Sequence, residues 1–243
     1  FLLQKLQGLK SVDPSSTIFA SQKDLVDFLF RSIMSKKFRK YSVSSEYQTH
    51  IRSALGSNVA HNEPIQIAFP FGGYKLWRLK ETPEVDWAEL FTLMYYVAWL
   101  KPLAAVYEPG VWFDFSSDEA IVERINNIPV EDTEQYTKSF LALITFLEGF
   151  IPKNIRFTLT PVRSRYTPEE FEEELGQRIE ALRTELGGLP ALDKEQKRMI
   201  ELNVQLRPEQ ESETDWREKV RFVLEAYHAM SKRRPYFRAA YKT

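Results

Sequence analysis

Three charged side chains follow two apolar segments of the chain, at places where chemistry commonly occurs in α/β proteins. Lys75 lies in the turn after segment 65–71, and Asp118 and Glu119 come soon after segment 111–115. Open α/β sheets bind ligands where the carboxyl ends of strands give way to loops. A lysine there could hold an anionic or carbonyl group, and a carboxylate could orient an amine, bind a metal ion or act as a general base. We therefore expect one site in which Lys75 lies within one side-chain length of Asp118 or Glu119.

Each of these features also has a structural explanation. Gly72 and Gly73 precede Lys75 in a GGYK turn, where close backbone approach and a positive charge could hold a phosphate. The turn matches neither a Walker A loop nor GxGxxG, and its glycines could simply permit positive φ. Asp118, or the serine before it, could likewise cap a short helix with Glu119 in its first turn. The residue types leave both interpretations open.

Composition excludes several classes of function. The 243 residues are enough for one large α/β domain, and the formal net charge of -1 gives no basic field that would favour nucleic acid. The lack of cysteine excludes disulfides, thiol nucleophiles and thiolate metal sites, and is compatible with a reducing, cytoplasmic location. The three histidines show no metal-site spacing, and no GxSxG motif is present. No segment reaches the roughly 18 apolar residues of a membrane span. We expect a small-molecule partner, and no cofactor, metal, nucleic acid or membrane.

Apolar segments alternate with helical patterns in the middle of the chain. The pattern predicts strands at 65–71, 111–115 and 155–162, a helix at 87–105 capped by Asp86, and a helix at 132–150 opened by Asp132. The middle strand does not alternate apolar and polar residues, which indicates burial on both faces. The first of the two helices is apolar nearly all round, which indicates cover on most sides. The order β-α-β-α-β predicts a Rossmann-like α/β fold, with a mostly parallel sheet and flanking helices.

Further helices are predicted on both sides of this core. Before it, Ser21 caps one helix, and a second short helix at 46–55 is closed by a GSN stretch. After it, segment 166–217 has a helical pattern that begins at residues 167 and 168, which suggests a helical insertion or lid. The expected organisation is a core with N-terminal helices at 1–165, the insertion at 166–217, and a C-terminal helix and basic tail of the core at 218–243.

Several short motifs between residues 65 and 145 occur in an order known from one enzyme family. They contain Phe69, Pro70 and Lys75; Asp86 and Glu89; Tyr107, Pro109 and Gly110; Ser117 and Asp118; and Tyr136. Their order and spacing resemble the isocyanide synthase family, which includes the pyoverdine and dityrosine biosynthesis enzymes. That family's segments run as F-P-x-K-S, P-D-x-x-E, I-Y-x-P-G-A and S-D-G-x-x-F. The chain departs from them in three ways: GGY precedes Lys75, Glu119 replaces a glycine, and Arg124 replaces an acid.

The resemblance implies a Rossmann-like fold and an enzyme of specialised metabolism that joins an amino acid's nitrogen to a carbon taken from a pentulose phosphate. We expect catalytic roles for Lys75, Asp118 and Glu119, and substrate-binding roles for Gly72, Gly73, Glu89 and Tyr136. In this scheme Lys75 holds an anionic or carbonyl group, one of the two acids orients the amine, and Glu89 lines the pocket or holds Lys75. The alternative is a non-catalytic α/β interaction or regulatory module, which would bind protein through the charged helices of 166–217.

Overall fold

A computed structural model describes residues 2–10, 19–37, 42–71, 83–117, 119, 123, 128–186 and 194. The chain divides into two compact units that interleave along the sequence. The first comprises Phe1–Phe69, Val85–Asp114 and Ser139–Thr158, and the second comprises Pro70–Glu84, Phe115–Lys138 and Leu159–Thr243. None of the helices in the described ranges is both long and apolar enough to cross a membrane.

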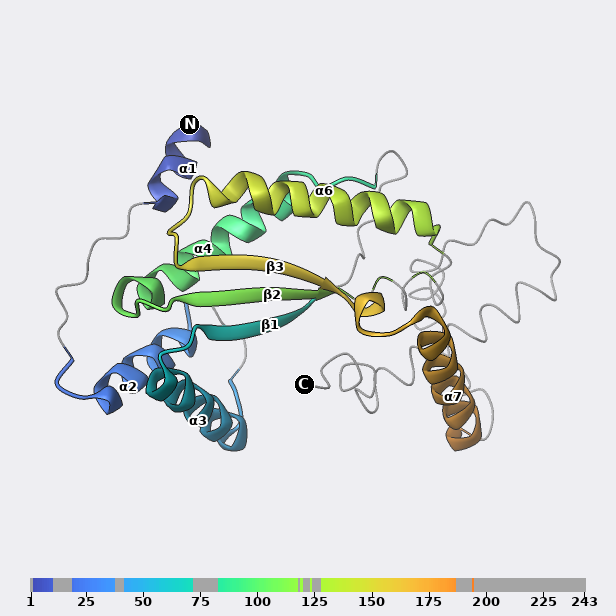
Figure 1. Ribbon diagram of the computed structural model, residues 1–243, viewed down its shortest axis with the longest axis horizontal. Helices are drawn as coiled ribbons and strands as arrows, with labels where there is room; N and C mark the ends of the chain where they lie inside the picture. The colour runs from blue at the N-terminus through green and yellow to red at the C-terminus, as the bar shows by residue number, and fades with distance from the viewer. Residues whose placement is uncertain are drawn as a thin grey trace. The chain divides into compact units, whose positions relative to one another are not determined.

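A three-stranded sheet contains β1 (Ile65–Phe71), β2 (Val111–Ser117) and β3 (Ile155–Pro161), in that order (Figure 1). The strands begin side by side. The Ile65 N–H donates to the carbonyl of Gly110 at 2.9 Å, and the Val111 N–H donates to that of Asn154 at 2.8 Å. Because all three strands start at the same edge, the sheet is parallel, and their carboxyl ends share the opposite edge. The predicted Rossmann-like α/β class is confirmed.

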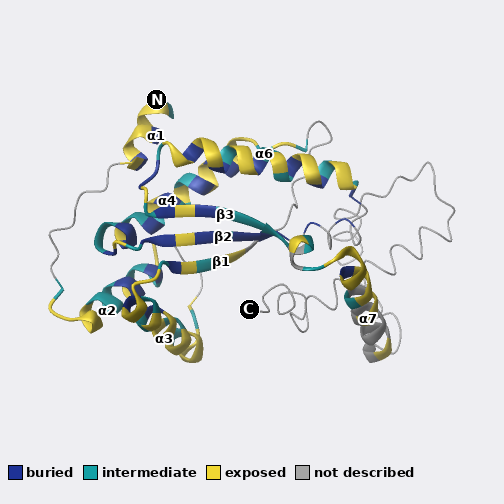
Figure 2. Cartoon of the chain, viewed as in Figure 1, coloured by how far each residue is buried: buried dark blue, intermediate teal, exposed yellow. Residues whose placement is uncertain are grey.

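The prediction that β2 is buried on both faces is wrong. Val111, Phe113 and Phe115 are buried, whereas Trp112 between them is 41% exposed and Asp114 is half-buried (Figure 2). The exposed face carries polar partners. The Arg156 guanidinium lies 5.2 Å from the centre of the Trp112 ring, and the Thr158 hydroxyl donates to Asp114 at 2.7 Å. A tryptophan under a cation and a paired carboxylate can meet water, so Trp112 and Asp114 need no cover, whereas Ser116 further along the same face is buried.

Helix α4 (Trp87–Val106) packs on the other face of the sheet and begins as predicted. The Asp86 carboxylate accepts from the Ala88 N–H at 2.6 Å, and the Glu89 carboxylate accepts from the Asp86 N–H at 2.8 Å, which together form a capping box. Tyr96 and Trp99 of this helix contact the ring of Phe113 in β2. The all-round apolar pattern of this helix had suggested that it is covered on most sides, and this prediction is wrong. Three large side chains at four-residue spacing are exposed: Trp87, Phe91 and Tyr95.

Three N-terminal helices belong to the first unit. α2 (Gln22–Ile33) is capped by Ser21 as predicted, because the Ser21 hydroxyl accepts from the Asp24 N–H at 3.2 Å. α3 (Ser45–His61) runs six residues past its predicted end at 55. Gly56 lies inside it, and an interior glycine costs a helix only about 1 kcal/mol. The helix ends instead at Asn62, whose left-handed φ of 56° closes the last turn. A further short helix, α1 (Leu2–Lys10), precedes α2.

The remaining helices follow the sheet in sequence. α6 (Val130–Glu148) begins two residues before the predicted Asp132, because the N–H groups of Asp132 and Thr133 already bond to the carbonyl of Pro129. After β3 come a 3₁₀ turn, η1 (Val162–Arg165), and α7 (Pro168–Leu186). α7 starts where predicted, with Thr167 and Glu170 capping each other reciprocally. Most of segment 187–243 lies outside the described residues, so the proposed insertion and tail stay predictions.

Candidate functional site

The predicted site residues divide into two groups. Glu119, Glu89 and Tyr136 are among the residues that the structure describes. Gly72, Gly73, Lys75 and Asp118 lie outside them. The expected proximity of Lys75 to Asp118 or Glu119 therefore stays a prediction. The second unit contains the described side chains that follow β2 and β3.

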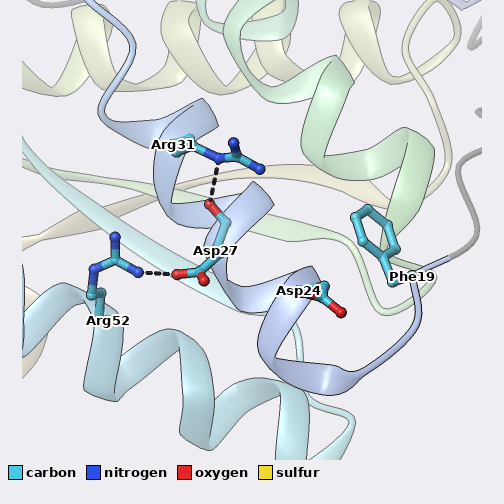
Figure 3. Close-up of a pocket in the computed structure, with 5 residues that line it drawn as sticks. All are labelled: Phe19, Asp24, Asp27, Arg31 and Arg52. Carbon is cyan, nitrogen blue, oxygen red and sulfur yellow. Dashed lines mark hydrogen bonds and ion pairs between the residues drawn. The ribbon is translucent and has the colours of Figure 1, made fainter.

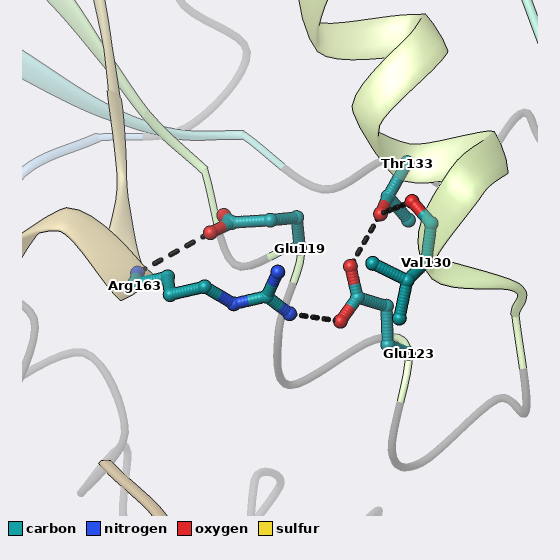
Figure 4. Close-up of polar contacts among 5 residues, drawn as sticks. All are labelled: Glu119, Glu123, Val130, Thr133 and Arg163. Atoms are coloured by element: carbon teal, nitrogen blue, oxygen red, sulfur yellow. Dashed lines mark hydrogen bonds and ion pairs between the residues drawn. The ribbon is translucent and has the colours of Figure 1, made fainter. Parts of the chain in front are cut away.

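Glu119 and Arg163 meet at the carboxyl edge of the sheet. Glu119 comes two residues after β2 and is buried, and Arg163 comes two residues after β3. The Arg163 main-chain N–H donates to Oε1 of Glu119 at 3.2 Å (Figure 4). Because β2 and β3 are parallel neighbours, their carboxyl ends lie together, and this brings two residues far apart in sequence into contact.

A second buried carboxylate, Glu123, completes the acidic pair. It accepts from Nη2 of Arg163 and from the hydroxyl of Thr133 (Figure 4). Thr133 is buried as well, and its Oγ1 also lies 2.8 Å from the carbonyl of Val130 at the start of α6. A hydroxyl has one proton, so these two acceptors share it. The cluster therefore joins the ends of β2 and β3 to the start of α6.

Charged groups of opposite sign meet in this cluster. Glu119 and Glu123 contribute two negative charges, and Arg163 contributes one positive charge. Buried carboxylates are costly unless partners or hydrogen bonds compensate them. An ionised carboxylate offers about four lone-pair directions, so each can accept more than one donor. The formal charge of these three side chains alone is one negative.

Tyr136 lies near the end of β1. Its ring stacks on that of Phe71 with centroids 6.0 Å apart and planes at 19°, and Phe71 in turn contacts Phe115 of β2. Tyr136 is buried and lies three residues after Thr133 on α6, so the two side chains share one side of that helix. The same helix thus supplies the hydroxyl that holds Glu123 and an aromatic ring at the end of β1.

Glu89 belongs to the first unit, where it takes part in the capping box of α4. It is buried, with its carboxylate on the main-chain N–H of Asp86. That contact explains why an acid stands at this position. A role for Glu89 toward a substrate or toward Lys75 stays a prediction.

Sequence reasoning missed Glu123, Thr133 and Arg163. Glu123 could have been found, because it follows Glu119 by four residues and a helical turn places such residues on one face. Arg163 could also have been found, because it follows a predicted strand as Lys75 does. Within the described ranges, no group of three or more acidic or histidine side chains is placed to hold a metal ion.

A separate hollow of about 340 Å³ lies on the first unit (Figure 3). It is lined by Phe19, Asp24, Asp27, Arg31 and Arg52. Arg52 forms an ion pair with the Asp27 carboxylate, and Nε of Arg31 donates to the neutral main-chain carbonyl of Asp27 at 3.3 Å. Two arginines balance two aspartates, so the hollow has no surplus charge to attract an ion.

Comparisons with known proteins add little to this geometry. A scan against protein-family models and a search of curated proteins give no match. A search of solved structures finds the crystal structure of the PvcA protein from Pseudomonas aeruginosa, at 16% identity and a TM-score of 0.49, over 95% of this chain and 71% of that one. At this identity and TM-score the likeness assigns neither a family nor an activity to the chain.

Proposed function

We propose that the chain is an isocyanide-synthase-like enzyme of specialised metabolism, which joins the nitrogen of an amino acid to a carbon taken from a pentulose phosphate. One observation carries the proposal. Glu119, next to the Ser-Asp motif that resembles this family, is buried at the carboxyl edge of a parallel sheet and is held there by the end of β3. Ligands of α/β sheets bind at this edge.

In the proposed reaction Glu119 or Asp118 orients the amine and accepts its proton. An ammonium group must lose a proton before its nitrogen can attack a carbonyl carbon, and a carboxylate beside it is a suitable general base. Lys75 would hold the phosphate or carbonyl of the sugar as a charged lysine, without forming a covalent intermediate. Gly72 and Gly73 would allow the sugar phosphate close to the main chain, and Tyr136 would support the ligand from α6.

The test is product formation by the purified chain. We would incubate it with each of the twenty L-amino acids and ribulose 5-phosphate, and look for an isonitrile by mass spectrometry. Glu119→Gln should lower the rate by about 100-fold or more, the usual size of a general-base effect. Glu169→Gln makes the same change at an exposed position on α7 and should leave the rate unchanged. If the wild-type chain forms no isonitrile from any of the twenty, the proposal is wrong.

The second candidate is a non-catalytic module that binds protein through segment 166–217. Its support is the exposed, charged side of α7, which includes Glu169, Glu172 and Glu173. Deleting 166–217 and repeating size-exclusion chromatography and partner capture discriminates the two. A deletion that leaves oligomeric state and capture unchanged, while abolishing small-molecule binding, would exclude the module.

A further inference from the structure

We infer that two copies of this chain form a symmetric dimer through the outer side of α4 and the second half of α6. Five large apolar side chains define this surface, called the α4–α6 face from here on: Trp87, Phe91, Tyr95, Leu141 and Phe146. Each of them is between 43% and 60% exposed. Exposed apolar patches larger than a few hundred Å² commonly mark sites of protein interaction. The inference does not depend on the proposed reaction.

Both helices contribute to one surface. The strands are parallel and follow one another in the order β1-β2-β3, so right-handed crossovers place α4 and α6 on the same side of the sheet. The Val85 N–H, just before α4, donates to the Ser139 hydroxyl of α6 at 3.1 Å, and both residues belong to the first unit. This bond puts the start of α4 beside the middle of α6. Figure 2 shows exposed stretches along α6.

The α4 part of the face is a ridge of rings beside a row of small side chains. Trp87, Phe91 and Tyr95 follow one another at four-residue spacing, and the first two rings stack with centroids 6.2 Å apart and planes at 26°. The adjoining row begins with the exposed Ala88 and Thr92. The Thr92 hydroxyl already donates to the carbonyl of Ala88 at 2.7 Å, so its burial would leave no proton unpaired.

A surface that carries both a ridge and a groove can pair with itself. In the commonest packing of two helices, the ridge of residues four apart on each helix fits the groove of the other. A two-fold dimer uses the same patch on both subunits, so the patch must be complementary to itself. The α4 side of the face meets this condition with its rings and the small side chains next to them.

Charge also favours a second copy. All of α4 is described, and its two charged side chains are withdrawn from the face: Glu89 is buried, and Lys101 is half-buried with Nζ on the carbonyl of Gly8. Two copies can therefore meet along α4 without like charges facing each other. A lipid surface suits the face less, because such surfaces favour Lys and Arg beside the apolar side. The exposed residues Glu84, just before α4, and Glu148, at the end of α6, are acids.

The exposed area is close to what a stable dimer buries. The five large side chains are on average about half exposed, and with about 200 Å² for each they offer about 500 Å². A specific interface buries about 600–1,000 Å² per partner. Four smaller residues of the two helices are exposed as well and supply further area: Ala88, Thr92, Ala142 and Thr145.

The first experiment measures the mass of the full chain by size-exclusion chromatography with light scattering, over a range of concentrations. The wild-type chain should have twice the mass of one copy. Phe91→Glu puts two like charges in the middle of the ridge and should raise the dimer Kd by about 30-fold or more, the size of a hot-spot loss. Tyr47→Glu makes the corresponding change at an exposed ring of α3 and should leave the dimer intact.

A second experiment uses cysteine and does not require a charged variant to fold. The chain has no cysteine, so a single introduced cysteine can form a disulfide only with another copy. Phe91 is the middle residue of the ridge, which puts it close to the two-fold axis. Phe91→Cys should therefore cross-link into covalent dimers on mild oxidation, whereas Tyr47→Cys should not, because a disulfide needs Cβ atoms about 4 Å apart.

Several outcomes would overturn the inference. They are a wild-type chain that stays monomeric up to about 100 µM, a dimer that survives Phe91→Glu, and equal cross-linking of the two cysteine variants. Sedimentation with phosphatidylcholine vesicles, with and without phosphatidylglycerol, tests a lipid surface. A monomeric wild-type chain that sediments with vesicles, and loses this in Phe91→Glu, would assign the face to lipid in place of a second copy. A dimer without isonitrile product would overturn the proposed reaction and leave this inference standing.

Discussion

Gly110 and Asn154 touch at the point where β2 and β3 begin. Gly110 has a φ of +76°, and a Cβ added to it would lie 1.8 Å from the carbonyl oxygen of Asn154. The same carbonyl accepts the N–H of Val111, and the Asn154 side-chain amide donates to the carbonyls of Ala104 and Tyr107. The end of α4, the start of β2 and the start of β3 are thus locked together at a position that only glycine can occupy.

Gly110→Ala should therefore unfold the sheet at its starting edge. Positive φ costs a residue with a side chain about 1–3 kcal/mol, and the overlap with Asn154 adds a comparable cost. We expect a loss of about 3 kcal/mol or more in the free energy of unfolding by urea. Gly56→Ala is the matched control, because a Cβ there meets nothing within 4 Å. Inside α3 it should stabilise the chain by about 1 kcal/mol. Equal effects of the two changes would contradict this account.

The Tyr107 hydroxyl ties the end of α4 to the segment between α3 and β1. It is buried, and it lies 2.9 Å from the carbonyl of Asn58 and 2.6 Å from that of Glu63. Tyr107→Phe removes the donor and leaves two carbonyls short of a partner, which should cost about 1–3 kcal/mol. Tyr47→Phe, at an exposed position, should cost almost nothing by the same urea measurement. A neutral Tyr107→Phe would show that water replaces the hydroxyl.

Local signals in the sequence predicted the starts of helices well. Ser21, Asp86 and Thr167 each cap a helix as expected, because a cap depends on a few neighbouring side chains. The strands were predictable because their buried residues are apolar. Their parallel order was predictable because a helix between two strands of one sheet forms the crossover that parallel strands need. The end of α3 was not predictable in this way. A glycine does not by itself end a helix, and Gly56 lies inside a helix that continues to His61.

Contacts between distant residues account for the other differences. Trp112 is apolar in type, yet it lies at an exposed position. Its ring tolerates this exposure because Arg156 of the neighbouring strand lies over it. The acidic cluster depends on pairing in the same way, since 44 residues separate Glu119 from Arg163. Glu119 was predicted as a site residue because it is charged and follows a predicted strand. The same reasoning would have given Arg163 too, had it been applied to the third strand.

Alkaline pH should weaken the fold through Tyr96. Burial, with a smaller effect of the neighbouring Tyr95, raises the pKa of Tyr96 from 10.0 to about 12. The folded chain thus holds this proton more tightly than the unfolded chain. The resulting stability is fully present below about pH 10 and is lost as pH rises towards 12. An absorbance titration at high pH should include the ionisation of Tyr96 near pH 12, and Tyr96→Phe should remove that contribution.

A control separates this effect from general alkaline unfolding. Burial also raises the pKa of Tyr107, with Glu63 as a smaller cause, so the slope of stability against pH should fall in part, not vanish, in Tyr96→Phe. Phe91→Leu changes an exposed ring that carries no titratable group and should leave that slope as it is in the wild-type chain. An unchanged slope in Tyr96→Phe would contradict the assignment.

The hydroxyl of Thr133 should stabilise the fold by its bond to Glu123. Thr133→Val keeps the shape of the side chain and removes the donor, which leaves a buried carboxylate with one partner fewer. The expected loss is about 1–3 kcal/mol in the free energy of unfolding. Thr145→Val makes the same change at an exposed position of α6 and should be nearly neutral.

A double-mutant cycle assigns this loss to the pair itself. In a Glu123→Gln background the charge that makes the Thr133 bond strong is gone, so Thr133→Val should cost less there than in the wild-type chain. The coupling energy between the two positions should be about 0.5–3 kcal/mol. A coupling energy of zero, with each change costing the same in either background, would mean that Thr133 acts through Val130 and the start of α6 alone. Glu123 would then be held by Arg163 without help from the helix.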